Sequence, residues 1–516
     1  MNRSSFLQWR NRTLVIVLVC VLLAILALRS ALPINLAAVD IGRHIANGQL
    51  ICAGNTDVLH KNYYSFTYPD HPFINHHWLF GVMAFFVFKA GGFPALSLLY
   101  IGIMMAAVLF FLRAAFLRGH RELAVLIAFL VLPLLWERRE IRPEGVSLLM
   151  MGLYFYLLTK LSLGKISKGF VFFILVIAQL IWVNTHIFFF MGPLLVAVFL
   201  WEGAARRCSV CVKQLGPLLF ITLAVNIFNP SGIAGMLTPL NIFKGFSYRL
   251  AENQNVLFMM SFFPKEGMYP YYLMLLGFGA LGVAGALWSR RISANLPFLA
   301  LIVFTALAGI KAVRLMPAYA AFLIPLGSFF WAQWQERWPH KIQSALKTLL
   351  ILVVLLIAVY QGMLIKPNKL RIGLFPGVNN SADFFKNNHL KGPIFSNYDI
   401  GGYLIYHFHD TEKVFVDNRQ EAFPKEFFQD VYMKMQRDDA VWYKVDDQYH
   451  FNVIYFYRHD LTEWGQNFLI TRIQDAGWAP VFVDDFTIIF LKRNDQNAPL
   501  ITQFELPKAM FGITRR

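Results

Sequence analysis

The sequence predicts an α-helical protein that crosses a membrane about eleven times and carries a small soluble α/β domain at its C-terminal end. Hydrophobic residues make up 57% of the 516 residues and charged residues only 15%, whereas about one quarter of a soluble globular domain is charged. The mean hydropathy of +0.50 agrees with this interpretation. Long apolar runs alternate with basic loops up to residue 366, and beyond it the composition is mixed. We therefore predict a transmembrane domain over residues 1–366 and a soluble domain over residues 367–516.

The net charge of +17 does not indicate a nucleic-acid partner. Nucleic-acid binding requires a basic face on a folded surface, but here the basic residues fall mostly between apolar runs, where they act as topology signals. Cys208 and Cys211 form an isolated CxxC with no second Cys or His pair beside it, and they predict no metal or redox centre. The predicted surroundings are a lipid bilayer.

Eleven apolar runs are predicted to form membrane-spanning helices. A helix needs about 20 apolar residues to cross the bilayer, and about 17 suffice where the bilayer adjusts. The first run predicts a retained anchor rather than a cleaved signal peptide, because it is too long and no small-residue cleavage site follows it. The runs are Thr13–Leu32, Phe93–Phe116, Glu122–Trp136, Gly145–Leu163, Phe170–Trp182, Phe188–Trp201, Gly216–Phe228, Met268–Trp288, Leu296–Ile310, Met316–Trp334 and Leu346–Ile365.

The loops between these runs assign the two sides of the membrane. The segment before the first run and every second loop after it are basic, and the positive-inside rule places this set in the cytoplasm. The N-terminus is then cytoplasmic, and an odd number of spans places the soluble domain outside the cytoplasm. The basic residues are Arg3, Arg10, Arg12, Arg113, Arg118, Arg121, Lys160, Lys165, Lys168, Arg206, Arg207, Lys213, Arg290, Arg291, Arg337, Lys341 and Lys347.

The loops on the opposite side hold unusual polar residues. The first external loop, residues 33–92, is long and contains five of the thirteen histidines. Basic residues elsewhere on this side oppose the topology rule, so they need another reason to be there. A functional site is therefore expected at the outer face. The polar residues of this side include Asp40, His44, Asp57, Asp70, His76, His77, the string from Glu137 to Glu144, Asn184, His186, Glu252 and Arg314.

The C-terminal domain alternates short strand and helix patterns, which is typical of a small α/β fold. Asp484 and Asp485 are predicted to form the turn of a final hairpin. The predicted strands are Pro393–Phe395, Gly402–Tyr406, Val414–Val416, Phe451–Tyr455, Pro480–Val483 and Thr487–Leu491, and the predicted helices are Ser381–Asn388, Lys425–Gln436 and Leu461–Gly477.

Asp40 and His44 are four residues apart and would share one face of a helix. A carboxylate beside an imidazole at the membrane surface could deprotonate a hydroxyl or bind a divalent cation. The alternative is a solvated carboxylate in a loop, and the spacing alone leaves both open.

Two further segments have a functional and a structural interpretation. The arginines between Glu137 and Glu144 could hold a phosphate, because guanidinium donors match phosphate oxygens, or they could pair with the glutamates between them. His76 and His77 precede Trp78 and an amphipathic run that ends at Lys89. That run favours an interfacial helix anchored by Trp78 over a site.

Short motifs along nearly the whole chain resemble those of bacterial membrane proteins with the GT-C glycosyltransferase architecture. The resemblance implies many spans, a long first external loop with an acidic residue, and an extracytoplasmic C-terminal domain. Such enzymes transfer a sugar from a polyprenyl-phosphate carrier, with the loop acid as base or metal ligand. The motifs are Asp40–His44 with Gly48, Tyr64–Thr67, Asn75–Leu79, Arg142–Pro143, Trp182–His186, Asn229–Gly232, Arg314, Asn397–Leu404 and Val416–Arg419.

Two positions depart from this pattern. Asn62 stands where the pattern usually has Asp, and His77 stands where Glu is usual before Trp-Leu. Fewer carboxylates weaken the case for a metal and keep a catalytically inactive scaffold as an alternative.

We therefore predict a GT-C-like glycosyltransferase of the bacterial inner (cytoplasmic) membrane. Its donor is a polyprenyl-phosphate-linked sugar, and its acceptor is a glycan, lipid or protein outside the cytoplasm. No cofactor is predicted, and a divalent cation is left open. A lipid or sugar transporter or flippase is the other alternative, but it would need mid-span charges and inverted repeats; the sequence has few of the former and no repeat. The predicted site is Asp40 as catalytic base, with His44, Arg138, Arg142, His186 and Arg314 binding the substrate.

Overall fold

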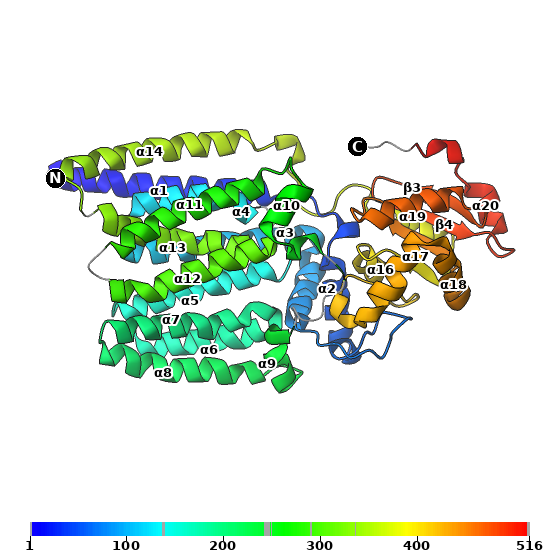
Figure 1. Ribbon diagram of the computed structural model, residues 1–516, viewed down its shortest axis with the longest axis horizontal. Helices are drawn as coiled ribbons and strands as arrows, with labels where there is room; N and C mark the ends of the chain where they lie inside the picture. Colours follow the sequence, from blue (N-terminus) through cyan, green and yellow to red (C-terminus); the bar gives the residue numbers. More distant parts are fainter. Residues whose placement is uncertain are drawn as a thin grey trace.

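The protein consists of a helical bundle and a sheet domain that pack end to end, with the first external loop between them (Figure 1). In the sequence-coloured ribbon the loop is blue, and it lies against the yellow and orange C-terminal segments. The computed structural model describes residues 3–136, 140–241, 248, 250–288, 292–335 and 337–512.

Within the described residues, ten helices are long and apolar enough to cross a membrane. They account for ten of the eleven predicted runs. The remaining run corresponds to α4, Arg121–Trp136, which has only 16 residues and packs inside the bundle against α1, α13 and α14. The ten helices are α1 (Arg3–Ser30), α3 (Trp78–Arg118), α5 (Glu144–Ser162), α6 (Lys168–Thr185), α7 (Met191–Ala205), α8 (Ser209–Ala224), α11 (Met268–Leu287), α12 (Ile292–Lys311), α13 (Met316–Gln335) and α14 (His340–Met363).

The start of α3 is a separate segment that holds the first loop in place. Its backbone leaves helical geometry at Gly91 and Gly92, and Gly92 adopts a φ of 64°, which favours glycine. The segment before this break contains the predicted interfacial helix from Trp78. It packs closely on α2, Ile41–Cys52. A Cβ added at Gly48 of α2 would lie 2.2 Å from the carbonyl oxygen of Gly81, so only glycine fits at this crossing.

The C-terminal domain contains a four-stranded sheet of order β1-β2-β4-β3. β1 (Ile394–Ser396) is parallel to β2 (Val453–Tyr457), whereas β4 (Thr487–Lys492) is antiparallel to both β2 and β3 (Trp478–Val483). The hairpin predicted at Asp484 is confirmed, because β3 and β4 flank it. The helices of the domain are α15 (Asn380–Asn387), α16 (Gly401–Phe408), α17 (Met433–Arg437), α18 (Asp439–Tyr449), α19 (Glu463–Gln474) and α20 (Ala498–Phe504).

Two of the predicted strands are wrong. Gly402–Tyr406 lies in helix α16, and Val414–Val416 contributes only an isolated bridge from Val414 to Ile394 and another to Ser65. A short run of apolar residues suits a strand or a buried helix equally well, so the pattern could not separate them. The helix α16 packs so closely on the next segment that a Cβ at Gly401 would be 2.4 Å from the Cα of Asp417, so only glycine fits there.

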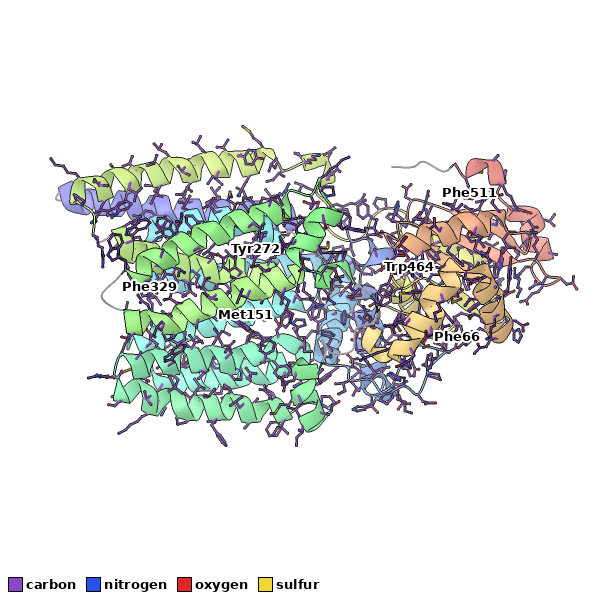
Figure 2. The ribbon with its side chains drawn as sticks, in the orientation of Figure 1. Phe66, Met151, Tyr272, Phe329, Trp464 and Phe511 are labelled. Atoms are coloured by element: carbon purple, nitrogen blue, oxygen red, sulfur yellow. A yellow bond between two sulfur atoms is a disulfide. The ribbon has the colours of Figure 1, made fainter. Side chains whose placement is uncertain are left out.

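The sheet is buried on both faces, and one of its faces belongs to the same core as the bundle. In β2, Val453 and Tyr455 join the large core that includes the bundle, whereas Ile454 and Phe456 join a second, aromatic core. Figure 2 shows Met151 and Tyr272 within the bundle and Trp464 in the sheet domain. The continuous core fixes the sheet domain against the end of the bundle.

Further contacts clamp the first loop to the sheet domain. Ile34 bridges to Leu374, and Ser65 bridges to Val414. The Arg419 guanidinium, held in a buried ion pair, donates a hydrogen bond to Asn62 Oδ1 at 2.9 Å. The loop therefore presents its own residues at the junction of the two bodies.

Candidate active site

A small cavity of about 110 Å³ lies at this junction and gathers polar residues from distant parts of the chain. Membrane helices, the first loop and the sheet domain all contribute. The lining residues are Asp40, Arg43, His44, His76, His77, Arg142, Pro143, Glu144, His186, Ile187, Phe188, Leu250, Glu252, Asn253, Arg314, Tyr398, Asn418, Gln420 and Glu421.

Asp40 occupies the N-cap position of α2, but its side chain does not cap the helix. Instead, its carboxylate accepts a hydrogen bond from the Asn418 side-chain amide, which comes from the sheet domain. Guanidinium nitrogens of Arg43 and Arg142 each lie 3.8 Å from a carboxylate oxygen of Asp40. Arg43 Nε also donates to Asn418 Oδ1 at 3.1 Å. Arg43, Arg142 and Asn418 therefore fix the position of the Asp40 carboxylate at the wall of the cavity.

Arg142 and Arg314 are linked through carboxylates. The Arg142 guanidinium lies 2.8 Å from Glu140 and 2.7 Å from Glu252. The Arg314 guanidinium lies 2.8 Å from Glu144 and 3.5 Å from the other oxygen of Glu252. Glu252 therefore bridges the two guanidiniums. The contact to Glu140 is made by Arg142 Nε, whereas the buried Nε of Arg314 has no hydrogen-bond acceptor among the described residues, so Arg314 retains a donor.

Four histidines form a buried cluster on one side of the cavity. The ring of His77 lies 4.0 Å from that of His76, 5.4 Å from that of His186 and 5.6 Å from that of His44, measured between centroids. Burial, together with the neighbouring rings and Arg43, lowers the pKa of His44 and His77 well below the usual value for histidine. Burial likewise lowers the pKa of His186 to about 3. The cluster is therefore uncharged at neutral pH.

The hydrogen bonds around His186 bear on which of its ring nitrogens carries the proton. Trp182 Nε1, which can only donate, gives a hydrogen bond to Ser147 Oγ at 2.7 Å, and Ser147 Oγ lies 2.7 Å from His186 Nδ1. With its oxygen accepting from Trp182, the Ser147 hydroxyl is free to donate to Nδ1. The neutral imidazole then carries its proton on Nε2, which leaves an N–H donor for a bound group.

The charges of the lining nearly balance. The guanidiniums of Arg43, Arg142 and Arg314 face the carboxylates of Asp40, Glu144, Glu252 and Glu421. The internal Arg–Glu pairing that the sequence allowed between Glu137 and Glu144 is present for Arg142 with Glu140, whereas Glu144 pairs with Arg314 from another part of the chain. Among the described residues, no three His, Cys, Asp or Glu side chains converge as metal ligands.

A second cavity, of about 470 Å³, adjoins the first and shares Arg142, Glu144 and Glu252 with it. Its other walls are mostly apolar and come from α4, α11, α13 and the short helix α10, Val256–Phe262. The polar cavity therefore adjoins, at these three shared side chains, a mostly apolar space at the ends of the membrane helices.

The structure brings most of the predicted site residues to one place. Asp40, His44, Arg142, His186 and Arg314 all line the polar cavity, although their roles stay predictions. Arg138 lies outside the described residues. The backbone N–H of His44 donates to the carbonyl oxygen of Asp40 at 3.1 Å, but no hydrogen bond joins their side chains in the described part of the chain. The ring of His44 packs edge-on against Phe80, and its buried Nδ1 has no hydrogen-bond partner there.

Other lining residues were missed as site residues. His76 and His77 were interpreted as part of an interfacial helix, and Glu144 and Glu252 as loop residues. Asn418 belongs to the quoted motif Val416–Arg419, but nothing in the sequence joins it to Asp40. The two departures also differ in location, because His77 lines the cavity whereas Asn62 binds Arg419 and does not.

No family model and no curated protein matches the sequence. Among solved structures, the archaeal oligosaccharyltransferase AglB from Archaeoglobus fulgidus, in complex with an inhibitory peptide and a dolichol-phosphate, aligns with a TM-score of 0.55 at 11% identity. The alignment covers 94% of this chain and 74% of AglB. The oligosaccharyltransferase of the same organism in the apo form gives a TM-score of 0.52 at 12% identity, over 92% of this chain and 74% of that one.

The arabinofuranosyltransferase AftD from Mycobacteria also aligns, with a TM-score of 0.52 at 13% identity. The alignment covers 94% of this chain but only 42% of AftD. At these identities the likeness shows the fold. The predicted fold class is confirmed: the chain is a multi-pass membrane protein with a GT-C-like architecture and a small C-terminal sheet domain.

Proposed function

We propose that this protein is a membrane glycosyltransferase that moves a sugar from a polyprenyl-phosphate-linked donor to an acceptor outside the cytoplasm. The single observation that carries the proposal is the joint placement of Asp40, Arg142 and Arg314 around one cavity that adjoins a mostly apolar space at the ends of the membrane helices. A lipid-linked donor needs both an apolar path for its chain and cations for its phosphate. The fold shared with AglB and AftD supports the same reaction class.

In this proposal the donor phosphate lies between Arg142 and Arg314. Glu252 bridges the two guanidiniums, so the phosphate would take the place of this carboxylate and Glu252 would turn away. The unpaired Nε donor of Arg314 adds hydrogen-bonding capacity for an anion. Displacement of Glu252 also changes the local balance of charge in favour of an anion, because one of four carboxylates leaves while three guanidiniums remain.

Asp40 is the proposed base of an inverting displacement. Its carboxylate takes the proton from an acceptor hydroxyl, and the hydroxyl oxygen attacks the anomeric carbon of the sugar. The bond from this carbon to the phosphate oxygen breaks, and polyprenyl phosphate leaves. Arg142 and Arg314 stabilise the charge that develops on the phosphate, and the Nε2–H of His186 is available to donate to an oxygen of the donor. Arg43 and Asn418 orient Asp40.

We also propose that the cavity lies on the extracytoplasmic side of a bacterial inner membrane. The short loops that join α5 to α6 and α7 to α8 lie at the bundle end away from the sheet domain (Figure 1). These loops carry Lys165 and Arg207, and the positive-inside rule assigns that end to the cytoplasm. The Cys208–Cys211 disulfide at the same end opposes this assignment, since disulfides are uncommon in the cytoplasm. The basic residues are the stronger indicator of the cytoplasmic side, because they recur from loop to loop whereas the disulfide is a single feature.

The test is turnover of the donor by the purified protein in liposomes. The substrates are polyprenyl phosphates that carry different single hexoses or pentoses, with cell-envelope extract as the source of acceptor. Release of polyprenyl phosphate reports the reaction whatever the sugar or acceptor. We expect release with at least one donor, and a loss of about 100-fold or more in Arg142→Gln. Arg493→Gln, which changes an exposed ion pair of the sheet domain, is the matched control and should retain activity.

Absence of release by the wild-type protein with every donor would contradict the proposal, as would equal activity of Arg142→Gln and Arg493→Gln.

A further inference from the structure

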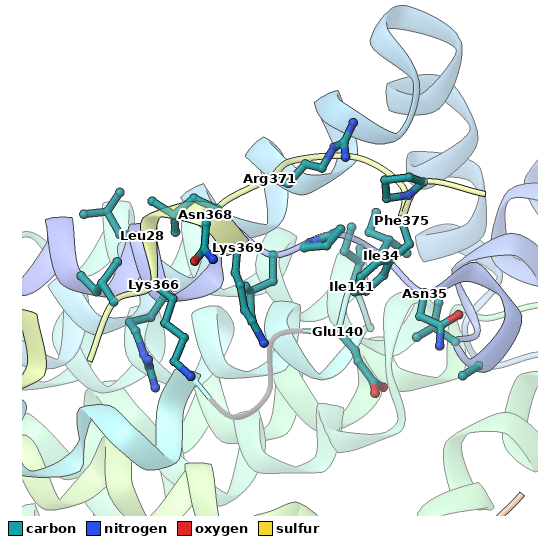
Figure 3. Close-up of a pocket in the computed structure, with 18 of the residues that line it drawn as sticks. Leu28, Ile34, Asn35, Glu140, Ile141, Lys366, Asn368, Lys369, Arg371 and Phe375 are labelled. Atoms are coloured by element: carbon teal, nitrogen blue, oxygen red, sulfur yellow. The ribbon is translucent and has the colours of Figure 1, made fainter. Parts of the chain in front are cut away.

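A third cavity, of about 920 Å³, lies where α1 and α14 end, and Tyr457 of β2 contributes to its wall (Figure 3). It is far larger than the polar cavity of the candidate active site. Its walls combine the ends of these two helices with the segment that leads into the sheet domain, and they include Asn35, Ala38 and Val39 just before Asp40. The volume lies within the range of about 300–1,000 Å³ that is usual for ligand sites.

Cations dominate the polar part of this cavity. Arg29, Lys366, Lys369 and Arg371 line it, whereas Glu140 is its only carboxylate among the described residues. Glu140 is already paired with Arg142 at 2.8 Å. No ion pair joins Lys366, Lys369 or Arg371 to a carboxylate in the described part of the chain. Figure 3 shows Lys366 and Lys369 extending to the same side of their segment.

Arg29 is held in place by the protein itself. Its Nη1 donates to the carbonyl oxygen of Leu364 at 2.8 Å, and its guanidinium lies 4.3 Å from the centre of the Trp136 ring. The Arg29 side chain therefore links the end of α1 to the end of α14, and it has a fixed position in the wall of the cavity.

The rest of the cavity is apolar and adjoins the lipid-facing surface of the bundle. Leu28, Leu32, Leu364 and Ile365 contribute to its walls. The outer face of α14 is strongly exposed and apolar, with Leu356 71% exposed. An exposed apolar helix face of this kind is expected to contact acyl chains. An anion that enters the cavity with a hydrocarbon tail would find both cations and an apolar path.

We infer that this cavity binds an anionic phospholipid, with the head-group phosphate at Lys366 and Lys369 and the acyl chains along α1 and α14. Basic residues that only anchor a span at the interface need no cavity. Lys366, Lys369 and Arg371, in contrast, line a large cavity and have no carboxylate partner in the described part of the chain. The site is separate from the proposed donor site, and lipid binding does not depend on glycosyl transfer.

Native mass spectrometry of the full-length protein in detergent tests the inference. The probes are phosphatidylglycerol, phosphatidylcholine with the same acyl chains, and inorganic phosphate. We expect tighter binding of phosphatidylglycerol than of phosphatidylcholine by about 30-fold, since two lysines near the head group contribute about 1 kcal/mol each and about 1.4 kcal/mol corresponds to tenfold. The double variant Lys366→Glu with Lys369→Glu should lose this preference.

Lys391→Glu with Lys444→Glu is the matched control, because it makes the same change of charge at exposed lysines of the sheet domain. It should bind phosphatidylglycerol as the wild type does. Equal loss in both double variants, or equal binding of the two lipids by the wild type, would overturn the inference. Displacement of the bound lipid by millimolar inorganic phosphate would also overturn it, because it would indicate a site for free phosphate.

Discussion

The central residue of the candidate site is Asp40, whose partners come from far along the chain. Its position just after the first span, and the resemblance, indicated an acidic residue at the membrane surface. The sequence could not show that Asn418, 378 residues away, donates to its carboxylate. The contact exists only because the first loop and the sheet domain pack together, and neither spacing nor composition encodes it.

The proposed base predicts the behaviour of Asp40→Asn. Asparagine keeps the shape of the side chain but cannot accept the proton, so transfer should fall by about 100- to 10,000-fold. Donor turnover, measured at matched membrane levels, checks this. Asp57→Asn and Asp70→Asn are the controls, since neither residue lines the cavity, and both should lose much less. Full activity of Asp40→Asn would remove this residue from the mechanism.

The histidine cluster predicts how stability depends on pH. Burial lowers the pKa of His186 to about 3 and also lowers that of His77, whereas an unfolded histidine titrates near 6.5. Below about pH 6.5 the unfolded state binds more protons than the folded state, so stability falls as pH decreases. Each such histidine contributes up to about 1.4 kcal/mol per pH unit.

Thermal unfolding between pH 7.5 and pH 5 measures this effect. The midpoint should fall on acidification, and it should fall less in His77→Phe, which keeps a ring but cannot be protonated. The exposed His389 provides the control variant His389→Gln, which should follow the wild type. Identical pH dependence of His77→Phe and the wild type would contradict a neutral buried His77.

At the scale of elements, the membrane helices were predictable and part of the sheet domain was not. A membrane span requires one long, continuous run of apolar residues, which is easy to recognise in a sequence. Each of the eleven predicted runs therefore coincides with a helix. The short segment Gly402–Tyr406 is apolar throughout, and its helical form depends on the close approach of α16 to the segment at Asp417. Tertiary contact thus decided what local pattern could not.

The crossing of α2 and α3 predicts the effect of Gly48→Ala. The added Cβ would lie 2.2 Å from the Gly81 carbonyl oxygen, so the helices must move apart. Overpacking of this kind costs about 1–3 kcal/mol, and it would also shift Asp40 and His44, which α2 positions. We expect a lower midpoint of thermal unfolding and reduced donor turnover.

Gly102→Ala is the control for this substitution, because a Cβ at Gly102 of α3 meets no atom within 4 Å. It should be neutral or slightly stabilising, as alanine favours a helix. A Gly48→Ala protein as stable as Gly102→Ala would show that the crossing tolerates a larger separation.

At the scale of the whole molecule, the site exists only where three parts of the chain meet. The first loop supplies Asp40 and three of the four histidines, the ends of the membrane helices supply Glu144, His186 and Arg314, and the sheet domain supplies Asn418. The grouping of polar residues in loops of one side predicted where the site would lie. It could not predict the Arg–Glu bridges, which depend on the distances between helix ends.

The proposed orientation predicts which cysteines a membrane-impermeant thiol reagent labels in intact cells. In a background without native cysteines, Lys444→Cys in the exposed part of the sheet domain should react, because that domain is placed outside the cytoplasm. Lys165→Cys, in a loop at the opposite end of the bundle, should react only after the cells are permeabilised. Labelling of Lys165→Cys alone in intact cells would reverse the orientation.

The central claim is that the polar cavity holds the phosphate of a lipid-linked sugar. Cryo-electron microscopy of Asp40→Asn with a bound short-chain polyprenyl phosphate tests it most directly. We predict phosphate density within about 3–4 Å of both Arg142 and Arg314, Glu252 turned away from them, and the hydrocarbon chain in the adjoining apolar cavity. Phosphate density only beside Lys366 and Lys369, with Glu252 still bridging the two arginines, would contradict the account.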